Sequence, residues 1–142
     1  MTSIPRHSVA VAGVTVREDG RILVVQRRDN GHWEAPGGVL EQDETFEQGV
    51  VREIAEETGV TVAVDHLSGV YKNMTIGVVA IVYRCHFVSG APTTTAESQR
   101  VEWLTADEVE DRMMPAYAVR ILDALTAEPC SRAHDGTIVH PC

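Results

Sequence analysis

Residues 38–60 read GVLEQDETFEQGVVREIAEETGV, a stretch that combines many acids with the apolar spacing of a helix. Thr45 can cap this helix, and Gln48 three residues later completes a capping box. Gly59 is the expected left-handed stop. Between Thr45 and Gly59, six residues recur at the spacing that puts them on one side of a helix. They are Phe46, Val50, Val51, Ile54, Ala55 and Thr58. The stretch therefore predicts an amphipathic helix over residues 46–58.

Three acids share one face of the predicted helix. Glu53, Glu56 and Glu57 stand at positions i, i+3 and i+4, beside the apolar face. Like charges at this spacing repel, and a divalent cation would turn the repulsion into attraction. Carboxylate oxygens are hard ligands that suit Mg²⁺ or Mn²⁺. A solvated helix face is also often acidic, so the three glutamates alone leave both interpretations open.

A glycine pair lies just before this helix. The segment PGG at residues 36–38 lets the backbone approach a ligand closely, so its carbonyls can reach the same cation. Together the two segments resemble the Nudix box, Gly-x5-Glu-x7-Arg-Glu-U-x-Glu-Glu-x-Gly-U, where U is a bulky aliphatic residue. Every fixed position is matched, by Gly38, Glu44, Arg52, Glu53, Ile54, Glu56, Glu57, Gly59 and Val60. The resemblance covers about residues 8–126 and is to small, single-domain members of MutT type.

The resemblance implies both a fold and a reaction. The fold is α/β, the Nudix α/β/α sandwich with a mixed β-sheet, in one domain over residues 1–127. The implied enzyme is a Mg²⁺- or Mn²⁺-dependent nucleotide pyrophosphohydrolase. Residues 61–91 lack the Pro typical of ADP-ribose-type members, and Gly77 and Val78 stand about where dinucleoside-polyphosphate members carry a Tyr. An ordinary or oxidised nucleoside triphosphate is therefore the favoured substrate.

Other activities remain open at this point. ADP-ribose, a nucleotide sugar or a dinucleoside polyphosphate could be the substrate instead. A non-catalytic module that binds a nucleotide as a sensor is the alternative from another class, although such a module has no need for every acid of the motif. Family members often pair, so a homodimer is also conceivable.

The resemblance assigns the metal ligands to the acidic helix and the glycine pair. Glu56 and Glu57 would ligate the catalytic cations. Glu53 would ligate metal or help to activate the attacking water. A backbone carbonyl of Gly37 or Gly38 would complete the protein part of the shell.

The remaining motif residues would act around these ligands. Arg52 is assigned to the catalytic residues, where it would orient Glu44 or Glu53. A further catalytic acid is expected after the central strands. Glu97 is the candidate because ESQRVEW resembles the E-x4-E-W stretch of MutT-type members, with Glu102 as the alternative. Glu97 could equally be a solvated loop acid. The structural part of the motif consists of Gly38, Glu44 and Gly59.

Five residues near the motif are candidates for substrate contacts. Arg27 and Arg28 end a predicted strand and could hold phosphates, unless they are simply an exposed strand end. Trp33 could stack on a base, although a Trp beside a core-forming segment often only packs. Tyr71 and Asn73 end another strand at the mouth of the expected cleft.

The rest of the chain supplies strands and two further helices. The pattern predicts a hairpin over residues 9–27, strands over 60–70, 76–88 and 100–105, a short helix opened by the capping box Thr105–Glu108, and a helix over 115–127. The strand over 76–88 is nearly all apolar and is expected to be central and buried on both faces. Residues 128–142 show no periodicity and are expected to be loosely attached.

Composition limits the partners. The 142 residues carry a net charge of -9, and no basic run suits a nucleic-acid polymer or a membrane surface. A phosphorylated small molecule remains compatible if cations bridge the charges. No signal peptide or membrane span is evident, which favours the cytoplasm. Cys85, Cys130 and Cys142 are accordingly expected to be free thiols.

Overall fold

The computed structural model describes residues 3–137, 139 and 142. Its strands are β1 (Ser8–Val16), β2 (Ile22–Arg27), β3 (Trp33–Glu34), β4 (Gly37–Val39), β5 (Thr61–Asn73), β6 (Val78–Ser89), β7 (Ser98–Leu104) and β8 (Cys130–His134). Its helices are α1 (Phe46–Thr58), α2 (Ala106–Arg112) and α3 (Pro115–Ala124). None of the helices in the described residues is long and apolar enough to cross a membrane.

In the described part of the chain, the strands form one mixed sheet. Its main order is β3-β2-β1-β6-β5-β8, with β4 paired to β1 and β7 paired to β2. β1 and β2 are the two strands of the predicted hairpin. β6 is central, as predicted, and runs parallel to β1 and antiparallel to β5. Only its first part is buried, because its last four residues, beginning at His86, are exposed.

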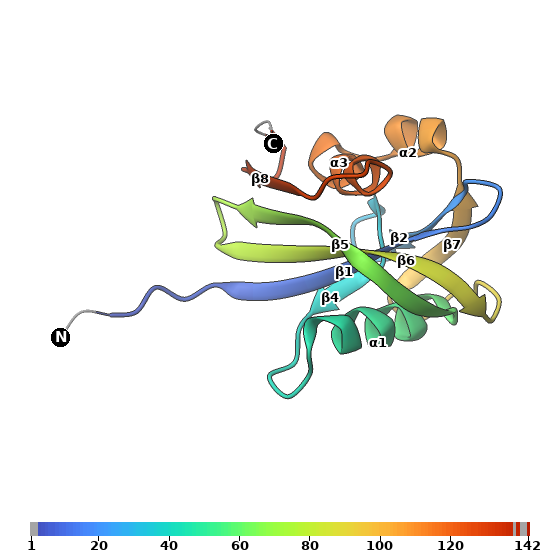
Figure 1. Cartoon of the computed structure of the whole chain (residues 1–142), viewed down its shortest axis with the longest axis horizontal. Helices are drawn as coiled ribbons and strands as arrows, with labels where there is room; N and C mark the ends of the chain where they lie inside the picture. Colours follow the sequence, from blue (N-terminus) through green and yellow to red (C-terminus); the bar gives the residue numbers. More distant parts are fainter. Residues whose placement is uncertain (1–2, 138, 140–141) are drawn as a thin grey trace.

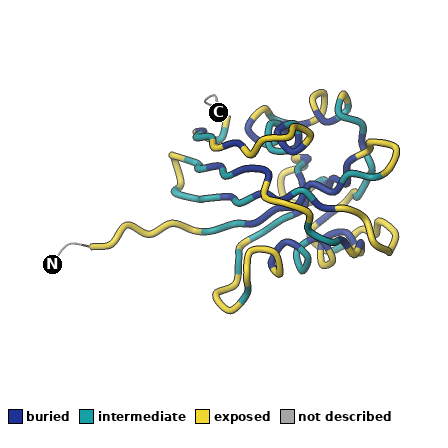
Figure 2. Tube along the Cα trace, in the orientation of Figure 1, coloured by how far each residue is buried: buried dark blue, intermediate teal, exposed yellow. Residues whose placement is uncertain are grey.

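Helices cover both faces of the sheet (Figure 1), with α1 on one side and α2 and α3 on the other. Successive residues of β1 point to opposite faces, so that Val11 packs toward α1 while Ala12 packs toward α3. The buried segments accordingly follow the sheet and the inner sides of the helices (Figure 2). The expected α/β/α sandwich is confirmed.

Helix α1 begins and ends at the predicted residues. The Thr45 hydroxyl accepts from the Gln48 N–H at 3.1 Å, and the Gln48 side-chain oxygen accepts from the Thr45 N–H at 2.9 Å. Gly59 ends the helix with φ 75°, in the left-handed region that favours glycine. Its apolar side buries Val50 and Ile54 against the sheet, which turns the acidic side toward β4.

The C-terminal residues are not loosely attached, contrary to the prediction. Residues 130–134 form β8 and extend the sheet by pairing parallel with β5. Arg132 of β8 donates to Asp123 through Nε and Nη2, each at 2.8 Å, and Tyr71 of β5 donates its hydroxyl to Asp123 at 2.7 Å. These contacts hold the segment from Cys130 to His134 against the domain. Helix α3 ends at Ala124, before the predicted end at residue 127, and the chain then turns back to the sheet.

The expectation of three free thiols is wrong for two of them. Cys130 and Cys142 form a disulfide with their Cα atoms 5.5 Å apart, within the usual range. Cys85 is free and lies buried in the core beside α1. The pairing brings the end of the chain back to the start of β8.

Candidate active site

The glycine pair in β4 lets this strand lie close to both β1 and the Glu53 carboxyl group of α1. A Cβ on Gly38 would come within 2.6 to 2.7 Å of the Glu53 carboxyl atoms, and one on Gly37 would come within 2.8 Å of Ala12 in β1. Real Cβ atoms do not approach other atoms so closely. Gly37 is therefore required for β4 to lie against β1, and Gly38 lets the Glu53 carboxyl group lie directly against β4.

Arg52 binds three of the four motif acids. Its guanidinium donates to Glu44 at 2.5 and 2.8 Å, to Glu53 at 2.9 Å and to Glu56 at 3.2 Å. Hydrogen bonds from Arg52 and from the Glu41 N–H lower the pKa of Glu44 to about 2. The structure thus brings Arg52 against both of the glutamates that it was expected to orient.

Glu57 is the motif acid without a cationic partner in the described residues. Only 9% of Glu57 is exposed, and its carboxylate accepts a long hydrogen bond, 3.4 Å, from the Gly37 N–H. Burial raises its pKa to about 8, and the negative charges of Glu53, Glu34 and Glu97 act in the same direction. The fold therefore gathers negative charge around a buried carboxylate that forms no ion pair with a Lys, Arg or His of the described residues.

These donors fit a hard divalent cation. In the described residues no three His, Cys, Asp or Glu side chains already form a cluster that could hold a metal ion. Arg52 holds Glu53 and Glu56, and like-charged carboxylates separate when no cation lies between them. The available ligand atoms are carboxylate and carbonyl oxygens, the type that Mg²⁺ and Mn²⁺ prefer. The uncompensated charge of Glu57 supplies the electrostatic need for such an ion.

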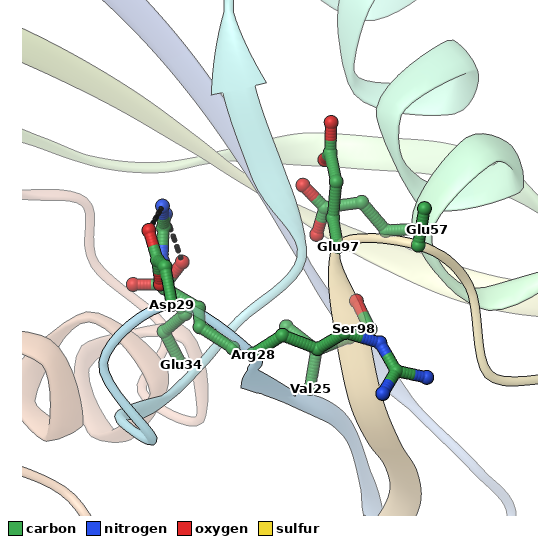
Figure 3. Close-up of a pocket in the computed structure, with 9 residues that line it drawn as sticks. Val25, Arg28, Asp29, Glu34, Glu57, Glu97 and Ser98 are labelled. Atoms are coloured by element: carbon green, nitrogen blue, oxygen red, sulfur yellow. Dashed lines mark hydrogen bonds and ion pairs between the residues drawn. The ribbon is translucent and has the colours of Figure 1, made fainter.

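A cavity of about 470 Å³ opens beside Glu57 and is called here the Glu57 cavity. Figure 3 shows Glu57 reaching into it from α1 and Glu97 reaching into it from the segment before β7. Its lining residues are Val25, Arg27, Arg28, Asp29, Glu34, Glu57, Ala96, Glu97 and Ser98. It has room for a chain of phosphates next to the candidate cation ligands.

A second cavity of about 230 Å³, called here the Arg120 cavity, lies between β4 and α3. Arg27 and Glu34 line both cavities, so the two adjoin. The other residues that line the Arg120 cavity are Ala10, Val11, Ala12, Ala35, Gly37, Gly38, Asn73, Ile76, Val78, Ala80, Tyr117 and Arg120. One end of the site is therefore acidic and the other is mainly apolar.

Of the two candidates for the additional acid, Glu97 lies at the site. It lines the Glu57 cavity, and its charge helps to raise the pKa of both Glu53 and Glu57. Glu102 lies elsewhere on β7 and accepts from Arg112 of α2 at 3.0 Å.

Both predicted phosphate-binding arginines line the Glu57 cavity. Arg27 is held by Asp29 at 2.6 and 2.8 Å and by Glu34 at 3.3 Å. Arg28 donates through Nε to the Thr95 carbonyl at 2.8 Å. Each guanidinium is thus positioned by the protein and keeps further N–H groups.

Two predicted substrate contacts are not available to a ligand of these cavities. Trp33 is buried in the core beneath α2 with the Arg112 guanidinium 5.3 Å from its ring, and it lines neither cavity. Tyr71 is fully buried and donates to Asp123. Asn73 does line the Arg120 cavity, where its side-chain oxygen accepts from the N–H groups of the following turn.

Three site residues were missed in the sequence. Glu34 lines both cavities, and burial raises its pKa. Its place two residues before the PGG segment could have drawn attention to it. Tyr117 and Arg120 stand three residues apart on α3, a spacing that puts them on one face of the helix. Nothing in the sequence shows that this face meets β4.

Comparisons with known proteins identify the family of the chain. The model of the NUDIX domain matches residues 6–125. A MutT-like protein of Streptomyces ambofaciens is 60% identical over 141 residues, 99% of this chain and 92% of that protein. The CTP pyrophosphohydrolase of Escherichia coli K12 is 27% identical over 132 residues, 89% of this chain and 98% of that protein. An ADP-ribose pyrophosphatase structure from Streptococcus suis has a TM-score of 0.75 at 20% identity, covering 91% of this chain and 100% of that one.

The fold is an α/β sandwich, and its candidate site combines an acidic helix with two adjoining cavities. The chain belongs to the Nudix family and is MutT-like, because the family model covers most of its length and a MutT-like relative matches nearly all of it. It is therefore a pyrophosphohydrolase of nucleoside diphosphate derivatives. Nudix hydrolases generally use a divalent metal ion, in agreement with the oxygen donors around Glu57.

Proposed function

We propose that this protein hydrolyses a nucleoside triphosphate to the monophosphate and pyrophosphate with Mg²⁺ or Mn²⁺. Glu53, Glu56 and Glu57 and a carbonyl of the Gly37–Gly38 pair would hold the cations. The observation that carries the proposal is the buried, uncompensated carboxylate of Glu57 beside a cavity that Glu97 also lines. The similarity to a CTP pyrophosphohydrolase supports a triphosphate as substrate.

The chemistry follows from the groups around the cavity. A bound divalent cation neutralises phosphate charge and lowers the pKa of a coordinated water. A carboxylate must take the proton of the attacking water. Glu53 and Glu97 both act electrostatically on Glu57, which supports them as the candidates for this role. Arg52 fixes Glu53 through a 2.9 Å contact, so Glu53 is the better positioned of the two.

In this proposal, Arg27 and Arg28 of the Glu57 cavity bind the phosphates. Arg27 and Arg28 line it opposite the motif acids and offer N–H donors that suit phosphate oxygens. Asp29 and Glu34 hold Arg27, which limits its freedom before substrate arrives. The phosphate chain would thus lie between cations on one side and guanidinium groups on the other.

A hydrolysis screen tests the proposal. Wild-type protein with Mg²⁺ or Mn²⁺ is incubated with ordinary and oxidised nucleoside triphosphates, ADP-ribose, nucleotide sugars and dinucleoside polyphosphates, and phosphate and pyrophosphate release is measured. We expect pyrophosphate from a triphosphate. We expect Glu57→Gln to lower kcat by about 10² or more, because a cation ligand is lost while the shape is kept.

Matched variants make the screen decisive. Glu47→Gln removes an exposed acid of the same helix and should keep full activity. Near-normal turnover in Glu57→Gln would contradict the proposed role of Glu57. Preferred cleavage of ADP-ribose would overturn the triphosphate assignment, and metal-dependent nucleotide binding without any turnover would indicate a sensor.

A further inference from the structure

Arg120 of α3 is a charged residue that the proposed chemistry does not use. Its guanidinium carbon lies 5.0 Å from the Tyr117 ring centroid and 5.5 Å from that of Tyr71. Its Nη2 lies 3.3 Å from Nε2 of His134. Its Nε is buried and has no hydrogen-bond partner in the described residues. No carboxylate in the described residues forms an ion pair with it.

An arginine in such surroundings is costly to the fold. Partly burying a guanidinium that forms no ion pair in the described residues loses hydration. Two aromatic faces, one imidazole and the attraction of the Glu34 carboxylate replace this hydration only in part. Arg132, nearby in β8, shows the usual solution, because it pairs with Asp123 at 2.8 Å. Arg120 instead lines a cavity, where a ligand can supply the missing acceptor.

The walls of the Arg120 cavity indicate what that ligand is. Small and branched apolar side chains form much of the lining, namely Ala10, Ala12, Ala35, Val78 and Ala80. A flat heterocycle suits such walls better than a phosphate does. Because the cavity adjoins the Glu57 cavity through Arg27 and Glu34, one nucleotide can occupy both.

We propose that the Arg120 cavity holds the base of the substrate and that Arg120 donates a hydrogen bond to a carbonyl oxygen of that base. This inference rests on the proposed triphosphate hydrolysis and adds its base preference. Guanine, hypoxanthine, cytosine, uracil and thymine all carry a carbonyl oxygen, whereas adenine carries none. The 6-amino group of adenine would face the guanidinium donor to donor. The site therefore selects bases with a carbonyl group and disfavours adenine.

Two substrates that differ at the base edge test this selection on the unmodified protein. ITP has a carbonyl at position 6, where ATP has an amino group. A substrate that makes a hydrogen bond to a charged group should have a kcat/KM about 10- to 100-fold higher than one that leaves the charged group unpaired. We expect the full-length protein with Mg²⁺ to prefer ITP by at least about tenfold, with the difference mainly in KM.

Variants of Arg120 connect the preference to this residue. Arg120→Gln should reduce kcat/KM for ITP about 10- to 100-fold more than that for ATP, so that the ratio of the two moves toward one. Arg120→Lys keeps a charged donor and should keep part of the preference. Arg100→Gln is the control, because Arg100 is an exposed arginine of β7 outside both cavities, and its ratio should equal that of the wild type.

The outcomes separate this inference from the proposed function. Equal hydrolysis of ITP and ATP by the wild type, or a preference for ATP, overturns the base assignment even if Glu57→Gln abolishes both reactions. A preference for ITP that persists in Arg120→Gln overturns the role of Arg120. If a variant unfolds, the comparison of ITP with ATP on the wild type still decides the base preference.

Discussion

At the scale of single residues, the partner of each acid decides what it can do. Arg52 neutralises Glu44 and Glu53, and the hydrogen bond from Arg52 lowers the pKa of Glu44 to about 2. Glu57 has no such partner, and burial raises its pKa to about 8. The motif thus contains an acid just before α1 that is ionised in any ordinary buffer, and an acid on α1 that titrates near neutral pH.

The raised pKa of Glu57 predicts a pH-dependent stability in the absence of metal. Between the ordinary value of 4.5 and the folded value of about 8, the folded state holds a proton that the unfolded state has lost. The free energy of unfolding therefore decreases as pH rises through this window, by a few kcal/mol at about 1.4 kcal/mol per pKa unit. Urea unfolding in EDTA at pH 5 and pH 8 measures the decrease.

Two variants isolate the contribution of Glu57. Glu57→Gln should flatten the decrease and be more stable than the wild type at pH 8 without metal, although its kcat should be far lower. Glu56→Gln, whose side chain is 62% exposed, should keep the wild-type slope. Mg²⁺ should restore stability at pH 8 in the wild type alone. Parallel curves for wild type and Glu57→Gln would show that burial of this carboxylate does not determine the slope.

The site could be predicted from sequence where the information is local. The spacing of Glu53, Glu56 and Glu57 was enough to place them near one another along α1, although their carboxylates do not form a cluster in the described residues. The direction of a strand side chain was harder to predict, because Tyr71 faces the core and its partner Asp123 is 52 residues away. For the same reason the sequence could not show that Arg120 lies next to the glycine pair.

At the scale of elements, local signals and tertiary pairing account for different parts of the fold. Helix α1 was predicted to the residue, because its cap, apolar face and stop lie within one segment. Strand β8 was missed, since the sequence CSRAH has no strand pattern and adopts this conformation by pairing with β5. The α/β/α architecture followed from the family resemblance rather than from any one element.

The capping box of α1 predicts a stability change separate from catalysis. Thr45→Ala removes the acceptor of the Gln48 N–H and should lower the free energy of unfolding by about 1 kcal/mol. The catalytic acids begin two turns later, so kcat should stay near the wild-type value. Chemical denaturation and the hydrolysis assay measure the two quantities.

A second capping box in the chain serves as the matched comparison. Thr105→Ala in α2 removes the same kind of contact, from the Glu108 N–H at 3.2 Å, far from the acids. Thr105→Ala should lower the free energy of unfolding by a similar amount. Thr45→Ser keeps a hydroxyl group and should therefore retain most of the stability that Thr45→Ala loses. A large fall in kcat for Thr45→Ala but not for Thr105→Ala would mean that the start of α1 positions the motif acids.

At the scale of the whole molecule, the family domain and the folded unit do not end at the same residue. The match to the family model stops at residue 125, while β8 adds an edge strand to the sheet over residues 130–134. His134 in this strand is 1% exposed, and Asp123, at 8%, receives two hydrogen bonds from Arg132. The C-terminal strand is therefore part of the packing, although it lies outside the expected domain of residues 1–127.

Deleting residues 128–142 tests how much the fold depends on this strand. The deletion exposes the edge of β5 and leaves Asp123 without Arg132, so we expect a lower Tm, a free energy of unfolding reduced by more than about 3 kcal/mol, and a tendency to aggregate. Arg132→Met breaks the ion pair but keeps the strand, and should cost only about 1–3 kcal/mol. Unfolding of the full chain with and without a reducing agent separates the contribution of the disulfide.

At low temperature the shortened protein should still hydrolyse its substrate, because the acids of α1 lie on the opposite face of the sheet from Asp123 of α3, the residue that Arg132 of β8 contacts. An unchanged Tm after the deletion would show that residues 1–127 are a complete folding unit and that pairing with β5 contributes nothing to stability.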